Sequence, residues 1–150
     1  MLSSAFIPTA MTESLATLYE SGLERYRAGE DPQALIPLFK EICERSTKNS
    51  PAWCSLAWLY LLADKPQPAL KAAQRSVKLD RSSAQARLNL AIAMLETNTK
   101  GVREHIEAAQ RIMALDSDTR NEIEENIADG LERRPEWASL LRVQAWLLGG

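Results

Sequence analysis

The chain has 150 residues, of which 45% are hydrophobic and 25% charged, and this composition supports one globular domain with a substantial core. A formal net charge of −2 and an isoelectric point near 5.5 argue against nucleic-acid binding, which usually relies on a strongly basic face. Cys43 and Cys54 are the only cysteines, and they match neither a disulfide framework nor a metal motif, so a reducing compartment is expected.

The first residues do not resemble a targeting or membrane segment. Residues 1–11 contain no Lys or Arg, no sustained apolar stretch and no periodicity, so we expect a flexible leader rather than a secretory signal. The longest apolar run, Ala57 to Ala63, is too short to span a bilayer. These features predict a cytoplasmic protein without a transmembrane segment, although peripheral membrane association through a partner stays compatible with them.

Two helices are predicted before residue 50. Apolar residues recur at helical spacing between Leu15 and Tyr26, and Thr12 is the expected N-cap of this helix. Asp31 and Pro32 open the second helix, because Asp caps well and Pro is tolerated in a first turn.

The clearest pattern lies between Ser50 and Ser83, which is typical of two helices joined by a tight turn. Pro51 and Pro66 fall in first turns, where a missing N–H costs nothing. The small residues Ala57, Ala69 and Ala73 allow the two backbones to approach closely. A lone pair of this kind cannot hide its apolar faces, so further copies are expected.

The same pattern recurs along the chain. Tyr26, Tyr60 and Met94 follow one another at intervals of 34 residues. The third copy opens on a predicted capping box, Ser82 with Gln85, and its turn over residues 97–101 is longer, so its second helix begins about two residues late.

After Asp116 the pattern degrades, and two more helices are expected. Thr119 and Glu122 form another predicted capping box, and that helix ends before Pro135. A last helix, which includes Trp137, stops at the two C-terminal glycines. This hairpin is either a divergent fourth copy or a cap that covers the open end of the array.

The stretch 50–83 resembles one tetratricopeptide repeat, whose pattern is W-x2-L-G-x2-Y followed by A-x3-F and a proline. The corresponding positions are held here by Trp53, Leu56, Ala57, Tyr60, Ala69 and Ala73. Arg81 stands where the proline is usual, and Ala73 where an aromatic residue is usual. The resemblance implies an all-α fold in which antiparallel helix-turn-helix repeats form a short right-handed superhelix. It divides the chain into a leader 1–11 and a single domain 12–150, with repeats over about 16–49, 50–83 and 84–117 and capping helices over 118–148.

In this family the first helix of each pair lines a concave groove that binds protein segments, and the resemblance projects a set of residues onto that groove. The projected residues are Glu20, Glu24, Arg27, Cys54, Trp58, Leu61, Leu62, Leu88, Asn89, Ile92 and Leu95. The groove is then acidic at one end and apolar in its middle, with Trp58 as the expected anchor for an apolar or amphipathic segment. Binding of a chaperone C-terminal carboxylate is rejected, because only Asn89 fits such a clamp while Glu20 and Glu24 have the wrong sign.

We therefore predict a non-enzymatic adaptor or assembly factor that needs no cofactor and acts as a monomer or a homodimer. The alternative is a structural subunit of a larger complex, in which a partner or the protein's own last helix covers the groove, and the C-terminal face around Trp146 is the contact. Trp137, Leu140 and Leu141 are the residues expected to supply the internal cover. An RNA-binding helical repeat is a third hypothesis, which the acidic isoelectric point opposes.

Other candidates favour ordinary structural roles. No nucleophile, phosphate-binding or metalloprotease motif is present, and His105 has no partner at a motif spacing, so a boundary position is expected for it. Cys43 and Cys54 are expected to behave as small buried residues that lie near each other. Trp53 and Tyr60 are expected in the core, and the acidic residues of 116–132 and the basic strip from Lys71 to Arg81 on solvated faces.

Overall fold

In the computed structural model, residues 14–149 are described, and these residues form eight α-helices and no strand. The helices are α1 (Leu15–Arg27), α2 (Pro32–Arg45), α3 (Ser50–Leu62), α4 (Pro66–Leu79), α5 (Ala84–Glu96), α6 (Val102–Leu115), α7 (Ser117–Arg133) and α8 (Ala138–Leu148). The all-α prediction is therefore confirmed over the described part of the chain. The leader predicted for residues 1–11 lies outside it.

Side-chain caps fix where several helices begin, and three of the predicted caps are wrong. Ser14 rather than Thr12 caps α1, where its Oγ accepts the Thr17 amide at 3.1 Å. Ser83 caps α5, because Ser82 turns back to Asp80 instead.

The third wrong cap lies at the start of α7. Its N-cap is Asp116, whose Oδ1 accepts the Asp118 amide at 3.0 Å, so the helix begins one turn before the predicted capping box at Thr119. At α2, the predicted cap Asp31 and first-turn Pro32 are confirmed.

The turns between paired helices explain the spacing of the repeats. The second helices of the first three pairs begin at Pro32, Pro66 and Val102, so the last of them starts two residues later than a 34-residue period requires. The extra residues lie in the α5–α6 turn, where Asn98 and Gly101 have positive φ values of 55° and 105°. The predicted insertion in the third copy is thus confirmed.

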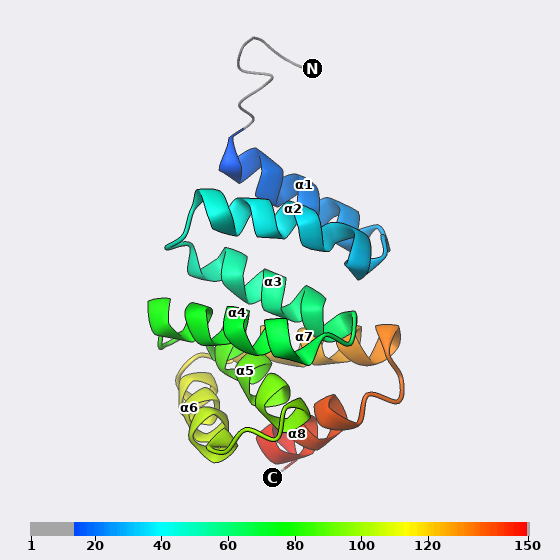
Figure 1. The fold of residues 1–150 in the computed structure, drawn as a ribbon. Helices are drawn as coiled ribbons and strands as arrows, with labels where there is room; N and C mark the ends of the chain where they lie inside the picture. Colours follow the sequence, from blue (N-terminus) through cyan, green and yellow to red (C-terminus); the bar gives the residue numbers. More distant parts are fainter. Residues whose placement is uncertain (1–13, 150) are drawn as a thin grey trace.

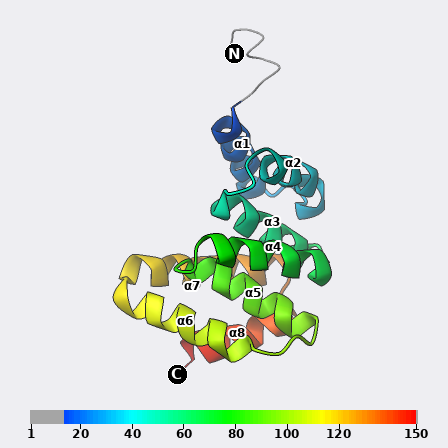
Figure 2. The same ribbon diagram turned by 60° about the vertical axis from the view of Figure 1, so that its left-hand side comes forward.

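Consecutive helices pack against each other, and the first six stack along one direction from α1 to α6 (Figures 1 and 2). Close approach of α3, α4 and α5 depends on small residues, since Ala57, Ala69, Ala73 and Ala91 are all fully buried. Trp53 and Tyr60 differ from the prediction, because both are half-buried at the edge of the core rather than inside it.

The last two helices turn back against the stack. Both α7 and α8 contact α5 and α6, and Figure 1 shows α7 behind α4. They complete a core cluster whose fully buried members include Leu61, Leu88, Ile92, Ile127 and Leu140. The apolar faces of the C-terminal hairpin therefore form part of the protein's core, while its other faces are exposed. No helix in residues 14–149 has the length and apolar character needed to cross a membrane.

Candidate functional site

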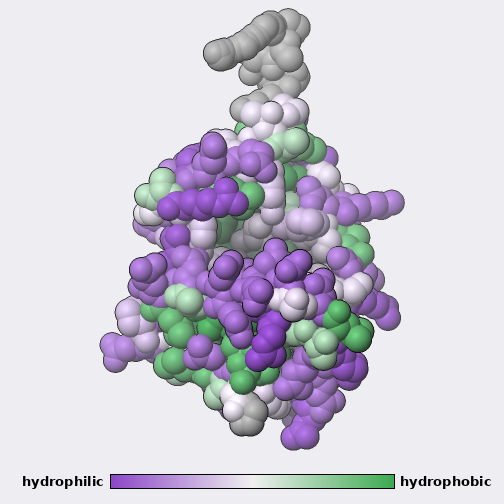
Figure 3. Space-filling view, turned by 180° about the vertical axis from the view of Figure 1, so that it is seen from behind, coloured by the Kyte–Doolittle hydropathy of each residue, from purple (hydrophilic) through white to green (hydrophobic). Residues whose placement is uncertain are grey.

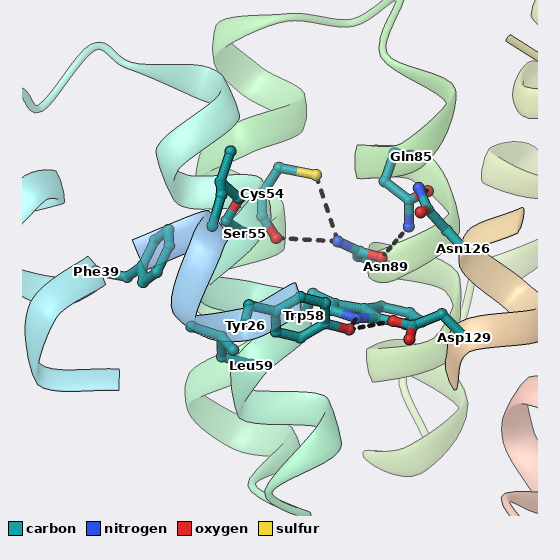
Figure 4. A pocket seen from close by; sticks show the side chains of 11 residues that line it. Tyr26, Phe39, Cys54, Ser55, Trp58, Leu59, Gln85, Asn89, Asn126 and Asp129 are labelled. Carbon is teal, nitrogen blue, oxygen red and sulfur yellow. Dashed lines mark hydrogen bonds between the residues drawn. The ribbon is translucent and has the colours of Figure 1, made fainter. Parts of the chain in front are cut away.

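The concave side of the stack carries a cavity of about 190 Å³ between α1, α3, α5 and α7. Figure 3 views the molecule from this side and shows it hollowed below the N-terminal helices, and Figure 4 shows the lining at close range. The lining residues are Leu23, Tyr26, Phe39, Cys54, Ser55, Trp58, Leu59, Gln85, Asn89, Asn126 and Asp129.

One wall of the cavity is apolar and aromatic. Leu23 comes from α1, Phe39 from α2, and Trp58 and Leu59 from α3. The Trp58 ring is fixed on its far side by the Trp137 ring, with centroids 5.5 Å apart. This wall can desolvate an apolar side chain that enters the cavity.

The opposite wall is a chain of amides that runs from α7 to α3 (Figure 4). Asn126 donates to Gln85 Oε1 at 2.9 Å, and Gln85 donates to Asn89 Oδ1 at 2.8 Å. Asn89 in turn donates to the carbonyl of Cys54 at 3.0 Å. Asn89 is completely buried, and both its Oδ1 and its Nδ2 already form hydrogen bonds. It therefore joins α5 to α3 and is not free to bind a carboxylate.

The cavity is closed at one end by a polar connection between α1 and α7. The Tyr26 hydroxyl donates to Asp129 Oδ2 and accepts from Trp58 Nε1 at 2.8 Å. Arg133 donates to the other Asp129 oxygen at 2.9 Å and to the Tyr26 carbonyl at 3.0 Å, and its guanidinium lies 3.8 Å from the centroid of the Tyr26 ring. Burial raises the pKa of Tyr26, and the Asp129 carboxylate raises it further, so the phenol stays protonated as a donor.

The structure separates the projected groove residues into three groups. Cys54, Trp58 and Asn89 line the cavity. Glu20, Glu24 and Arg27 are exposed on α1 beside it. The remaining residues belong to the interior formed with α7 and α8, half-buried in the case of Leu95 and buried for Leu61, Leu62, Leu88 and Ile92.

These four residues are packed in one core cluster with Trp137 and Leu140, so they do not lie at the surface of the cavity as the projection placed them. Leu141, which was expected to help cover them, is instead 43% exposed. The cavity residues Leu23, Phe39, Leu59, Asn126 and Asp129 were not projected onto the groove. Leu23, Phe39 and Leu59 lie at core-like positions of their helices, and the degraded pattern after residue 116 gave no register for α7.

The remaining candidates have structural surroundings in the described part of the chain. Burial raises the pKa of Cys43 and of Cys54 to about 12 in each case, and both thiols are free. His105 is half-buried, and its Nδ1 lies 2.9 Å from Arg87 Nη1. The acidic residues of 116–132 were predicted to lie on a solvated face, but Asp129 is half-buried and paired with Arg133. No group of three His, Cys, Asp or Glu residues within 14–149 could hold a metal ion.

No known family profile and no curated protein sequence matches the chain, but solved structures match most of it. PcrH in complex with the chaperone-binding region of PopD is 16% identical, with a TM-score of 0.67 over 99% of this chain and 96% of that chain. The type III secretion translocator chaperone SycD of Yersinia enterocolitica is 15% identical, with a TM-score of 0.64 over 87% and 94%. MamA is 18% identical, with a TM-score of 0.61 over 94% and 80%. The chain has the tetratricopeptide-repeat fold. At these identities the likeness establishes the architecture alone.

Proposed function

We propose that the protein is a non-enzymatic adaptor or assembly factor that holds an apolar or amphipathic segment of a partner protein in the cavity between α1, α3, α5 and α7. The observation that carries the proposal is a concave site with a preformed aromatic wall around Trp58 and Leu23. The structure of PcrH with the chaperone-binding region of PopD supports it, because a chain of this fold there holds a segment of another protein.

The two walls of the cavity contact different parts of the bound segment. An apolar side chain of the segment lies against Leu23, Phe39 and Trp58, where loss of water supplies most of the affinity. Asn126 uses only its Nδ2 in the amide chain, so its Oδ1 can accept from the segment's backbone, and the Ser55 hydroxyl also lies at the cavity surface. Because the connection between Tyr26 and Asp129 closes one end, the site accepts a short anchor rather than a long helix laid along the whole stack.

A structural subunit of a larger complex is the second candidate. It is favoured by the packing of α7 and α8 residues with Leu61, Leu88 and Ile92, which takes these three side chains out of the groove. In that case the exposed C-terminal face with Leu141 is the contact. The two candidates therefore predict different sensitive surfaces.

The test compares two Leu-to-Glu variants in an affinity purification from the native host. Leu23→Glu places a charge in the cavity wall, and Leu141→Glu makes the same change on the exposed face of α8. We expect Leu23→Glu to lose the protein that copurifies with wild type, while Leu141→Glu retains it. Circular dichroism establishes that both variants are folded.

Loss of the partner with Leu141→Glu but not Leu23→Glu would reject the cavity in favour of the subunit reading. A second measurement covers the case in which Leu23→Glu does not fold. Cys54 lines the cavity whereas Cys43 is buried elsewhere, so in a Cys43→Ala protein the bound partner should slow maleimide labelling of Cys54. Unchanged labelling in the complex would place the partner outside the cavity.

A further inference from the structure

The cavity continues into a second hollow of about 270 Å³ between the α4–α5 turn and the first half of α7. Gln85 and Asn126 line both hollows, so the amide chain is the boundary between them. The second hollow is lined by Asp80, Ser82, Ser83, Ala84, Gln85, Thr119, Glu122, Ile123 and Asn126. The concave face is therefore one groove with two compartments of different chemistry.

The residues of 14–149 that line the second compartment carry hydroxyl and carboxylate groups, and none of them is a Lys or Arg. Asp80 already accepts the Ser82 amide at 3.0 Å, which leaves its second oxygen unused by that contact. Glu122 is exposed and forms no ion pair within residues 14–149. Neither Asp80 nor Glu122 forms an ion pair within residues 14–149. Their two negative charges therefore make this end of the groove attractive to a positive group.

Charges beside the first compartment do not reverse this preference. Asp129 is already paired with Arg133. On α1, Arg25 is exposed but paired with Glu30, so Glu20 and Glu24 outnumber the exposed Arg27, which forms no ion pair within residues 14–149. The second compartment has one such cation next to it, Arg81, against the carboxylates of Asp80 and Glu122. Carboxylates therefore outnumber unpaired cations at both ends, so the groove favours a basic segment over an acidic one.

We infer that the preferred partner segment is bipartite, with an apolar anchor for the compartment at Trp58 and a Lys or Arg a few residues away for the compartment at Asp80 and Glu122. This inference rests on the proposed function and adds the chemistry of the partner to it. The two hollows adjoin at Gln85 and Asn126, so one extended segment can fill both. The apolar anchor supplies affinity, and the cation supplies direction and selectivity.

The experiment selects peptides from a randomised 12-residue phage library on the full-length protein. Three baits are used: wild type, Glu122→Lys in the second compartment, and Glu107→Lys, which makes the same charge change at an exposed α6 residue outside both hollows. We expect wild type and Glu107→Lys to enrich an apolar residue with Lys or Arg at a fixed separation. Glu122→Lys should lose that basic position.

Selected peptides are then synthesised, and their affinities are measured by fluorescence polarisation. Replacing the basic residue, or reversing Glu122, should weaken binding about two- to fivefold at low salt, the size expected for a partly exposed charge pair. The difference should shrink as salt is raised to about 0.5 M. Slower labelling of Cys54 in the Cys43→Ala protein locates each peptide in the groove.

The possible failures separate the inference from the function on which it rests. Peptides that protect Cys54 but show no basic preference, or keep it with Glu122→Lys, would overturn the bipartite partner and leave the adaptor function intact. A selection that yields no peptide able to protect Cys54 would overturn the adaptor function and the inference together.

Discussion

The phenol of Tyr26 donates a hydrogen bond to the carboxylate of Asp129, which lies 103 residues further along the chain. This bond joins the first helix of the stack to the helix that covers its concave side. The same hydroxyl accepts from Trp58, so three helices meet at one oxygen atom. Arg133 also joins α7 to α1, through the Tyr26 carbonyl and ring, so a substitution at the hydroxyl tests one part of this end wall separately.

Tyr26→Phe should destabilise the protein by about 1–3 kcal/mol, because it leaves Trp58 Nε1 and one Asp129 oxygen without their partner in a partly buried site. The ring and its contact with Arg133 remain, so the loss reports on the hydroxyl alone. Urea denaturation followed by circular dichroism measures the change in the free energy of unfolding.

The matched control for this variant is Tyr60→Phe. The Tyr60 hydroxyl forms no hydrogen bond within residues 14–149 and lies on the convex side, so its removal should change stability by less than about 0.5 kcal/mol. Equal effects of the two substitutions would show that the Tyr26 hydroxyl has no special role in joining α1 to α7.

Gly130→Ala should destabilise the protein although alanine is the better helix former. A Cβ at this position would lie 2.7 Å from Leu140 Cδ2 and 2.9 Å from Trp58 Cη2. The helix-propensity gain is at most about 1 kcal/mol, and overpacking typically costs about 1–3 kcal/mol. We expect a net loss of about 1 kcal/mol in denaturant unfolding. A variant more stable than wild type would show that α7 and α3 are not in such close contact.

A double-mutant cycle locates the clash. Trp58→Phe makes room beside residue 130, so Gly130→Ala should cost less in the Trp58→Phe background than in wild type. Equal costs in both backgrounds would assign the strain to Leu140 instead.

The repeated helix pairs could be predicted from the sequence because their signal is local. A period of 34 residues, prolines in first turns and small residues at close contacts all depend on neighbours within one hairpin. The two-residue insertion before α6 was also visible, since the apolar positions resume late.

The path of α7 could not be predicted in the same way. Its acidic sequence fits a solvated helix, and nothing local indicates that Asp129 binds Tyr26 or that Gly130 lies against Trp58. This placement decides which projected residues are open: Trp58 lines the cavity, whereas Leu61 and Ile92 are buried, and binding at Trp58 stays a prediction. Tertiary contacts with one late helix thus outweighed the repeat pattern.

Trp58→Ala illustrates the consequence. From the sequence we expect a loss of binding with little change in stability, but the structure places this ring between Tyr26, Gly130 and Trp137. Its truncation should therefore cost about 3–5 kcal/mol. Thermal unfolding of Trp58→Ala beside Trp53→Ala checks this, because Trp53 packs only at the core's edge. A larger loss for Trp53→Ala would instead support the prediction from the sequence, in which Trp53 is a core residue and Trp58 an anchor in the groove.

His105 should make the protein less stable at acidic pH. Burial lowers the pKa of its ring, and the positive charge of Arg87 lowers it further. The folded state therefore favours the neutral imidazole, whose Nδ1 accepts from Arg87. Its contribution is complete above the unfolded-state pKa of about 6.5 and is lost as the pH falls through the lower folded-state value. Urea midpoints between pH 7.5 and 5 should fall more steeply for wild type than for His105→Gln, and parallel curves would contradict the assignment.

The two thiols should react slowly at neutral pH and differ from each other. Burial raises the pKa of each to about 12, so the thiolate is about a thousandfold scarcer at pH 7 than for a thiol of pKa 9. Cys54 lines the open cavity, whereas Cys43 is 1% exposed and needs local opening of the core before it can react.

In single-cysteine variants, labelling of Cys54 by maleimide should accelerate with pH and exceed that of Cys43 in native buffer. In denaturant the two rates should converge. Equal native rates would show that the cavity does not admit the reagent, and would remove Cys54 as a reporter of groove occupancy.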